Sequence, residues 1–175
     1  MKNRNVSIIQ DTNDKKIVVI HDILFMGKRQ INWKNVEKYL KQYIGEIYTI
    51  VETQDLVYIG KEFAEEYGGS KDTAQLKGTL AKAKANAASG IPELIEIATK
   101  KRFKENFAGK HRKNAKYGWY RLDSRFAIPV YNTNEEIERY NVFHVEMLIR
   151  HDKNRKLYLY DIVNIKKEPS TPPKQ

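Results

Sequence analysis

The chain has 175 residues and no cysteine, which excludes disulfide bonds and zinc sites built on thiolates. Hydrophobic residues make up 41% of it and charged residues 31%, a composition that suits one globular domain with a buried core. The formal net charge of +10 favours a polyanionic partner. No stretch approaches the roughly 20 apolar residues of a membrane span, and no signal peptide is evident, so we expect a cytoplasmic protein.

The first third of the sequence predicts a flexible start, a strand, a helix and a hairpin. Residues 1–16 are polar and are expected to be flexible, whereas residues 16–25 are apolar and β-branched, as in a buried strand. Asn32 is a typical N-cap for a helix that ends before Gly45. Residues 46–60 alternate as two short strands around a turn, which indicates a hairpin.

The middle third predicts two helices. Between residues 70 and 89, apolar side chains recur at helical spacing, at Leu76, Leu80, Ala83 and Ala87. Gly90 marks the end of this helix, and Pro92 suits the first turn of the next. We expect the second helix to run into the basic residues that begin at Lys100.

The last third predicts three strands, at about residues 117–130, 140–150 and 156–165, joined by short turns rich in Asn and Asp. Strands that follow one another across short turns favour an antiparallel meander. The predicted fold class is therefore α+β: N-terminal helices packed on an antiparallel sheet whose C-terminal part is a three-stranded meander. We expect a single domain over residues 17–166 and a flexible C-terminal tail over residues 167–175.

Side chains alternate between the two faces of a strand, so the pattern assigns a core face to the predicted sheet. The residues expected to be buried together on it are Leu122, Phe126, Phe143, Val145, Ile149, Leu157 and Leu159. They should pack against helix residues Leu76, Leu80, Leu94 and Ile95. In the third strand the alternation adds Val163 and Ile165 to this face, with Asp161 as a polar exception.

The opposite, open face of the predicted sheet carries aromatic and charged side chains. They are Trp119, Arg121, Asp123 and Arg125 on the first strand, Tyr140, His144, Glu146 and Arg150 on the second, and Tyr158, Tyr160, Asn164 and Lys166 on the third. Aromatic rings stack on bases and cations hold phosphates, so this face suits a nucleic acid. The alternative is a solvent-facing sheet whose Arg and Glu residues form cross-strand pairs.

Positive charge is concentrated between Lys100 and Arg125, where ten Lys and Arg residues stand against two acidic residues, a net charge of +8. A charge this dense can hold a polyanion through counterion release, and a solvated basic loop is the alternative. We expect nucleic-acid contacts from Lys110, Arg112, Lys113, Lys116, Trp119, Tyr158, Tyr160 and Lys166.

The open face also contains the groups that are needed to cleave RNA through its own 2′-hydroxyl, without a metal or another cofactor. His144 or Glu146 would take the hydroxyl proton, and the two lie on one strand roughly 6–7 Å apart. His111 would serve as the acid or as a mobile phosphate ligand. The phosphate would be held by three arginines, Arg121, Arg125 and Arg150. The histidines show no spacing that is typical of metal ligands.

Three segments, KAKANAASGIPELIEIATKKRF, KYGWYRLDSRFAIPV and YLYDIVNIKKEPSTP, resemble a family of small proteins and C-terminal domains carried by bacterial phages and integrative conjugative elements. Helices followed by a sheet with a basic face are also similar in layout to the barnase–EndoU–colicin–RelE group of metal-independent ribonucleases. Phage-borne members of that group occur as toxin domains. The likeness of layout implies active residues on the sheet, of the types present at His144, Arg121, Arg125, Arg150 and Tyr158.

Three hypotheses about function follow from these patterns. The first is a metal-independent ribonuclease of a mobile element, which an immunity protein would hold in check. The second is a non-catalytic protein that binds RNA or DNA on the same face. The third is an interaction protein, such as an inhibitor of a host defence enzyme, which docks its basic surface on an acidic partner.

Overall fold

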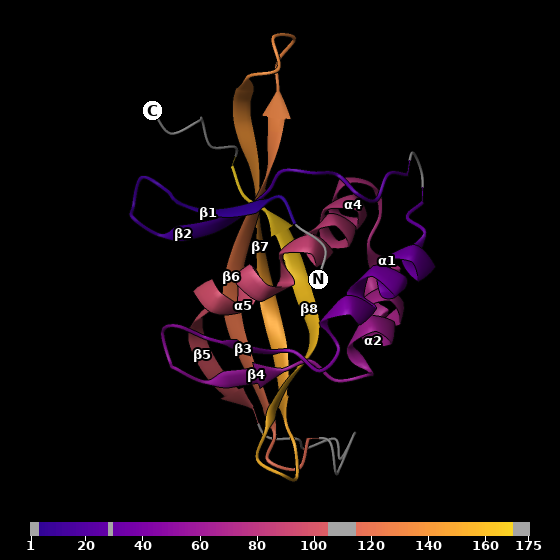
Figure 1. Cartoon of the computed structure of the whole chain (residues 1–175), viewed down its shortest axis with the longest axis vertical. Coiled ribbons are helices and arrows are strands. Elements are labelled where there is room, and N and C mark those ends of the chain that lie inside the picture. Colours follow the sequence, from indigo (N-terminus) through magenta and orange to yellow (C-terminus); the bar gives the residue numbers. More distant parts are fainter. Residues whose placement is uncertain (1–3, 28–29, 105–114, 170–175) are drawn as a thin grey trace.

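The computed structural model describes residues 4–27, 30–104 and 115–169. In these residues the chain folds as α+β, which confirms the predicted class. A long, twisted sheet runs through the molecule, and the helices gather on one side of it (Figure 1). No helix in the described ranges is long and apolar enough to cross a membrane.

The sheet in the described residues has eight strands: β1 (Val6–Gln10), β2 (Lys16–Ile20), β3 (Ile47–Thr49), β4 (Leu56–Tyr58), β5 (Thr99–Lys104), β6 (Trp119–Tyr131), β7 (Ile137–His151) and β8 (Leu157–Lys167). Their order is β1-β2-β6-β7-β8-β4-β3, and β5 pairs with the first half of β6. At 13 and 15 residues, β6 and β7 are long enough to reach from one end of the sheet to the other, and they form its centre.

The sheet is mixed, whereas the sequence predicts an antiparallel one. β6, β7 and β8 pair in antiparallel fashion. β2, however, runs parallel to β6, and β4 runs parallel to β8. Both parallel pairs join strands that are separated in the chain by helices, and such crossover connections return the chain in the same direction.

The N-terminal segment that was expected to be flexible, residues 1–16, contains the strand β1. It pairs with β2 over all five of its residues. Val6 packs against the main core, and Ile9 packs against a small second cluster on the other face of the sheet. Backbone pairing with β2 and these two contacts stabilise β1. The polar residues on both sides of it gave no sign of a strand.

The helices are α1 (Trp33–Leu40), α2 (Phe63–Gly69), α3 (Lys71–Gln75), α4 (Gly78–Ala87) and α5 (Ile91–Ile97), with short 3-10 turns η1 (Lys41–Tyr43) and η2 (Ala88–Gly90). Asn32 caps α1 as predicted, because its side chain accepts a hydrogen bond from the N–H of Asn35. Gly45 follows η1 with a φ of 87°, a conformation that favours glycine.

The helix predicted over residues 70–89 is divided into α3 and α4. Ser70 caps α3 by accepting a hydrogen bond from the N–H of Thr73. Leu76 then takes an extended conformation and Gly78 has a φ of 56°, so the chain turns before α4 begins. Leu76, before the break, and Leu80, after it, both pack against the core. Their spacing therefore resembles that of one continuous helix, although the chain turns between them.

Two elements depart from the sequence predictions. α2 is not evident in the sequence. Its buried apolar residues, Phe63, Ala64 and Tyr67, span little more than one helical turn, which is too short to show a helical pattern. Residues 99–104 were expected to continue a helix and instead form β5. The reason is that α5 ends at Ile97 and the chain after it pairs with the free edge of β6.

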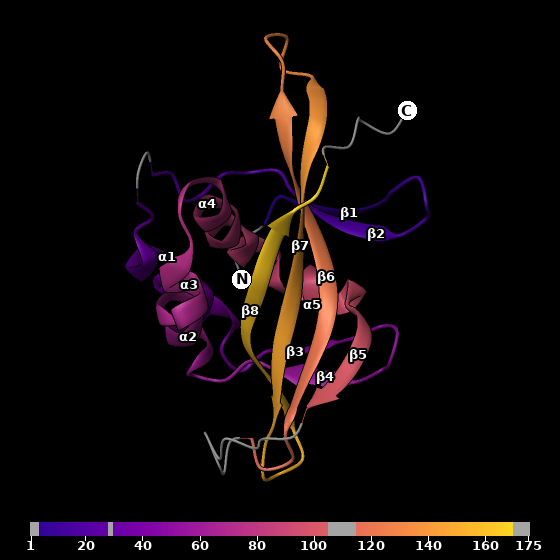
Figure 2. The ribbon, with the colours of Figure 1, turned by 180° about the vertical axis from the view of Figure 1, so that it is seen from behind.

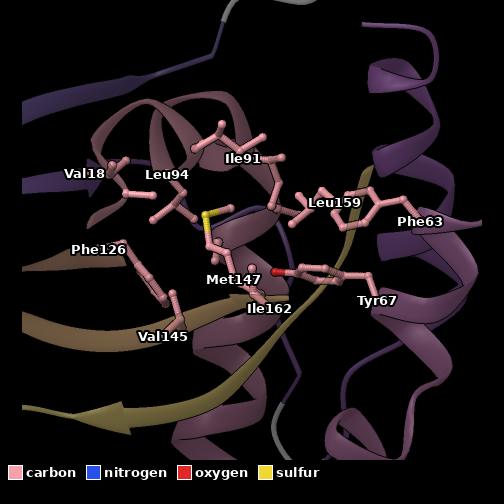
Figure 3. Close-up of a cluster of buried hydrophobic side chains, with 14 of the residues drawn as sticks. Val18, Phe63, Tyr67, Ile91, Leu94, Phe126, Val145, Met147, Leu159 and Ile162 are labelled. Atoms are coloured by element: carbon pink, nitrogen blue, oxygen red, sulfur yellow. The ribbon is translucent and has the colours of Figure 1, made fainter. Parts of the chain in front are cut away.

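The core lies between the sheet and the helices. The predicted sheet residues are all buried in one cluster with Leu94 and Ile95: Leu122, Phe126, Phe143, Val145, Ile149, Leu157 and Leu159. Leu76 and Leu80 are partly buried at its margin, as predicted contacts of the same cluster. Figure 3 shows side chains of the sheet meeting those of α5 and α2.

The alternation of side chains is interrupted in β8. The register between β7 and β8 shifts at two places. Ile162 therefore takes the core position opposite Met147. Val163, predicted for the core face, is buried but lies opposite Glu146 on the other face of the sheet. An irregular pairing of this kind moves the following side chains to the other face.

Candidate functional site

The open face of the sheet is the side of β6, β7 and β8 that is turned away from the core. Figure 2 shows this side, and none of the described helices lies in front of the three strands. Charged side chains of β6 and β7 face each other across it: Asp123 lies opposite Glu146, and Arg125 lies opposite His144. The structure thus brings together the charged residues that the alternation predicts for this face.

Glu146 is held by two neighbours on the open face. Arg121 donates a hydrogen bond to its Oε1 over 3.0 Å, and Asn164 donates one to its Oε2 over 3.2 Å. Partial burial alone would raise the pKa of Glu146, but these hydrogen bonds outweigh it and lower the pKa below its usual value. A carboxylate with a lowered pKa is a weak base, so the geometry does not favour Glu146 as the group that takes a proton.

Arg125 is also engaged by carboxylates. Its guanidinium donates to Asp11 over 2.8 Å and, through two nitrogens, to Glu168 over 2.9 and 3.0 Å. Arg121 is paired with Glu146 in the same way. These two arginines, which were predicted to hold phosphate, therefore already have anionic partners. The pair of Arg121 and Glu146 is the cross-strand pairing that the sequence leaves open as an alternative, whereas the partners of Arg125 lie outside the strands.

His144 lies between two cations. Its backbone partners are Arg125 on β6 and Lys166 on β8, so the three side chains form a row across the open face. Nε2 of His144 is 3.5 Å from Oδ1 of Asp123, and the same oxygen accepts a hydrogen bond from Arg102 over 3.0 Å. This imidazole, beside a fixed carboxylate, is the acid–base candidate that the geometry favours.

A pocket of about 480 Å³ opens beside His144. It arises because β2 and β5 pair with the same edge of β6 at different places: β2 meets it at Phe126 and Ala127, and β5 meets it at Asp123. The charged residues that line the gap are Asp14, Lys15, Lys16, Glu52, Glu96, Lys100, Asp123 and Arg125. The pocket therefore presents both signs of charge next to the imidazole.

Arg150 does not have the place that the sequence predicts. It was expected on the open surface as a phosphate ligand, but its side chain is only 7% exposed. Its guanidinium lies 4.3 Å from the centre of the Tyr158 ring and 3.5 Å from Glu62 at the start of α2. Because its side chain is buried against the Tyr158 ring and Glu62, Arg150 in this conformation is closed to a phosphate on the open surface.

The aromatic residues of the open face contact one another. Trp119 and Tyr160 meet edge to face with ring centroids 5.1 Å apart, and Tyr158 lies 5.6 Å from Tyr58. Burial raises the pKa of Tyr160, and a hydrogen bond with Glu66 raises it further, so its hydroxyl remains protonated. These rings are partly buried. Only their exposed parts are accessible to a nucleic-acid base for stacking.

The predicted nucleic-acid contacts of the basic window are described only in part. Lys110, His111, Arg112 and Lys113 lie outside the described residues. Lys116 is exposed, and its ammonium lies 5.6 Å from the centre of the Tyr117 ring. Lys166 is exposed on β8.

Two residues of the site escape the sequence reasoning. Asp123 is placed on the open face by the alternation, but nothing in the pattern pairs it with His144. Arg102 is counted only as part of the basic window, and it reaches the face because β5 pairs with β6. Residues 99–104 contain three consecutive cations and no alternation, and the register shift that lets Arg102 reach Asp123 has no local signal.

No family model, curated protein or solved structure matches the chain. In the part of the chain that the structure describes, no group of three or more His, Asp or Glu residues is arranged to hold a metal ion. The function is therefore inferred from the geometry of the site itself.

Proposed function

We propose that the protein is a metal-independent ribonuclease that uses His144 as its acid–base group. One observation carries this proposal: His144 lies in a row between Arg125 and Lys166, with Asp123 beside it and a pocket next to it. An imidazole flanked by cations suits a bound phosphodiester, because the cations attract the phosphate while the ring exchanges a proton with it.

The reaction needs a base, an acid and positive charge. Neutral His144 takes the proton from the 2′-hydroxyl of RNA, and the 2′-oxygen forms a bond to phosphorus while the bond to the 5′-oxygen breaks. The leaving 5′-oxygen receives a proton from the imidazolium or from water. The products are a 2′,3′-cyclic phosphate and a 5′-hydroxyl, and nearby cations stabilise the pentavalent phosphate.

Asp123 would act on the substrate only through His144. Its Oδ1 lies 3.5 Å from Nε2 of the imidazole, close enough to set the orientation of the ring. Arg102 donates a hydrogen bond to Asp123 and holds that carboxylate in place. Asp123 is thus a positioning residue, and Arg102 supports it.

Lysines are better suited than arginines to supply the free positive charge. Arg125 is held by Asp11 and Glu168, so much of its charge is already neutralised. Lys166 on the open face and Lys16 at the pocket are exposed. Lys15 and Lys100 also line the pocket and are exposed, so a phosphate beside His144 would have several lysines near it, while the guanidinium of Arg125 also contacts its two carboxylates.

The test compares His144→Gln with His21→Gln in the cleavage of a labelled single-stranded RNA. His21 is a matched control, because it also lies at the surface and contacts a hydroxyl, that of Ser7 at 2.9 Å. His144→Gln is expected to lose about 10²–10⁴-fold in rate, while RNA affinity is retained. His21→Gln should cleave like the wild type, EDTA should have no effect, and the products should end in a 2′,3′-cyclic phosphate.

A second candidate is a non-catalytic RNA-binding protein. The exposed Lys116 and Lys166 favour it, because binding needs cations at the surface and no proton transfer. If the wild-type protein binds RNA and does not cleave it, the ribonuclease proposal fails and this one stands. If it neither binds nor cleaves RNA, both fail, and the charged face is better explained as a surface that docks on a protein.

A further inference from the structure

A row of four rings lies at the end of the sheet where β5 ends and β6 begins. Its members are Phe103, Tyr120, His151 and Tyr117, called here the aromatic row. Neighbouring ring centroids are 5.3 Å apart between Phe103 and Tyr120, 5.8 Å between Tyr120 and His151, and 5.3 Å between His151 and Tyr117. The rings come from β5, β6, β7 and the turn before β6, so the row depends on the folded sheet.

Cations lie over the rings of this row. The ammonium of Lys101 is 4.3 Å from the centre of the Tyr120 ring, and it is also paired with Asp55 over 2.7 Å. Lys116 and Arg155 lie 5.6 and 5.5 Å from the centre of the Tyr117 ring. Cations at such distances are attracted to ring faces, and the arrangement supplies positive charge directly beside flat apolar surfaces.

Phe103 is the most unusual member of the row, because its side chain is 53% exposed. The backbone is shaped around it: Gly118 has a φ of 95°, and a Cβ there would lie 2.8 Å from Cε1 of Phe103. Any other residue would therefore push against the ring. Several other large hydrophobic residues of the described chain are equally exposed, and what distinguishes Phe103 is that its ring continues a series of ring contacts through Tyr120.

The aromatic row is separate from the site around His144. Tyr120 lies next to core residues on the helix side of β6, whereas His144 lies on the open face. Along β6, five residues separate Tyr120 from the position opposite His144, a distance of about 17 Å. Figure 1 shows β5 and the start of β6 at the bottom of the molecule, where the sheet runs past α5.

We propose that the aromatic row binds single-stranded nucleic acid by stacking of bases on its rings, with Lys116 and Arg155 beside the phosphates. Stacking needs an unpaired base with a free face, so single strands are favoured over duplexes. The cations attract the negatively charged phosphates, and this attraction does not depend on the base sequence of the nucleic acid. This surface goes beyond the proposed cleavage site, and its binding does not depend on catalysis.

The experiment measures fluorescence anisotropy of a fluorescein-labelled 2′-O-methyl RNA of about 12 nucleotides, a length within the range that one binding module covers. This probe has no free 2′-hydroxyl, so it reports binding whether or not the protein is a ribonuclease. The variant is Phe103→Ala. Its matched control is Tyr131→Ala, which removes another aromatic side chain of similar exposure, 47%, from the far end of β6.

Phe103→Ala is expected to weaken binding of the single strand by about 5- to 150-fold, the loss of one stacked base. Phe103→Trp should restore the affinity, and Tyr131→Ala should leave it unchanged. The duplex form of the probe should bind more weakly than the single strand. Equal affinities for Phe103→Ala and Tyr131→Ala, or equal affinities for single strand and duplex, would overturn the proposal. Tighter binding of an acidic polypeptide than of the probe would also overturn it and point to a protein partner.

Discussion

At the scale of single residues, Lys84 has the most demanding position. It is completely buried, and its ammonium lies 3.0 Å from Asp161 and 3.2 Å from Asp72. Asp72 also accepts a hydrogen bond from the backbone N–H of Asn164. A buried charge of this kind is tolerated only with its partners, so the three residues join α3 and α4 to β8.

The carboxyl of Asp161 responds to this environment. Burial raises its pKa to about 7, although the charge and the hydrogen bond of Lys84 act in the opposite direction. Because this pKa exceeds the ordinary value of 3.8, the folded chain binds the proton more tightly than the unfolded chain does. The stabilisation from that proton is complete below pH 3.8 and is lost as the pH rises through about 7.

Asp161→Asn is therefore expected to remove a part of the pH dependence of stability. In the wild type, the free energy of unfolding should fall by about 2–3 kcal/mol between pH 5 and pH 8 through this group. The amide does not titrate, so the variant should show a smaller fall. Urea unfolding across this pH range measures both, and Asp14→Asn in an exposed turn is the control. An unchanged pH dependence in Asp161→Asn would show that the carboxyl titrates normally.

At the scale of elements, β7 connects the core to the candidate site. Phe143 points into the core and stacks on Phe126 with ring centroids 5.2 Å apart. His144, the next residue, points to the opposite face and lies beside Asp123. Since neighbouring residues of a strand face opposite sides, the packing of Phe143 determines where His144 is presented.

Phe143→Ala is expected to lower the free energy of unfolding by about 3–5 kcal/mol, because the cavity left in the core is only partly filled by its neighbours. Chemical denaturation measures the loss. Tyr131→Ala, in the exposed part of β6, is the control and should change stability by less than about 0.5 kcal/mol. If the two variants lose the same amount, Phe143 does not belong to the core.

The same two strands show how far the sequence predicts the fold. In β6 and β7 the alternation is regular, and the predicted core residues are buried there. In β8 a shift of register replaces Val163 by Ile162 in the core, and no local pattern announces such a shift. α2 is too short to leave a helical pattern, and β5 becomes a strand only because β6 offers an edge for pairing.

Only a part of the candidate site was predictable: the alternation places several of its residues on the open face, but it does not give their pairings. Alternation places Arg125 on the open face, but its partners Asp11 and Glu168 come from opposite ends of the described chain. Arg150 shares the predicted face of β7, yet it is buried against the Tyr158 ring and Glu62, and no local pattern pairs it with either. Charge neutralisation on this face is thus a property of tertiary packing, which a count of local charge does not contain.

At the scale of the whole molecule, the two ends of the sheet differ in charge. The hairpin formed by the far ends of β6 and β7 projects from the body and carries Glu135, Glu136 and Glu138 near its turn (Figure 1). The opposite end carries the cations of β5 and of the turn between β7 and β8, namely Lys100, Lys101, Arg102, Lys104, Lys153, Arg155 and Lys156. A polyanion would therefore be drawn to the end that holds the aromatic row.

The strength of this attraction should appear in its salt dependence. Each single-strand phosphate that a cation neutralises releases counterions and adds about 0.7 to the slope of log affinity against log salt concentration. Lys104, exposed on β5 next to the aromatic row, should contribute to this slope, whereas Lys82, exposed on α4, should not. Lys104→Gln is expected to reduce the slope by about 0.7 and to weaken binding of all sequences alike. Anisotropy titrations of the 2′-O-methyl probe at several salt concentrations measure it, with Lys82→Gln as the control. An affinity that stays level from low to high salt would mean that the basic end of the sheet is not a surface for nucleic acid, whatever its net charge.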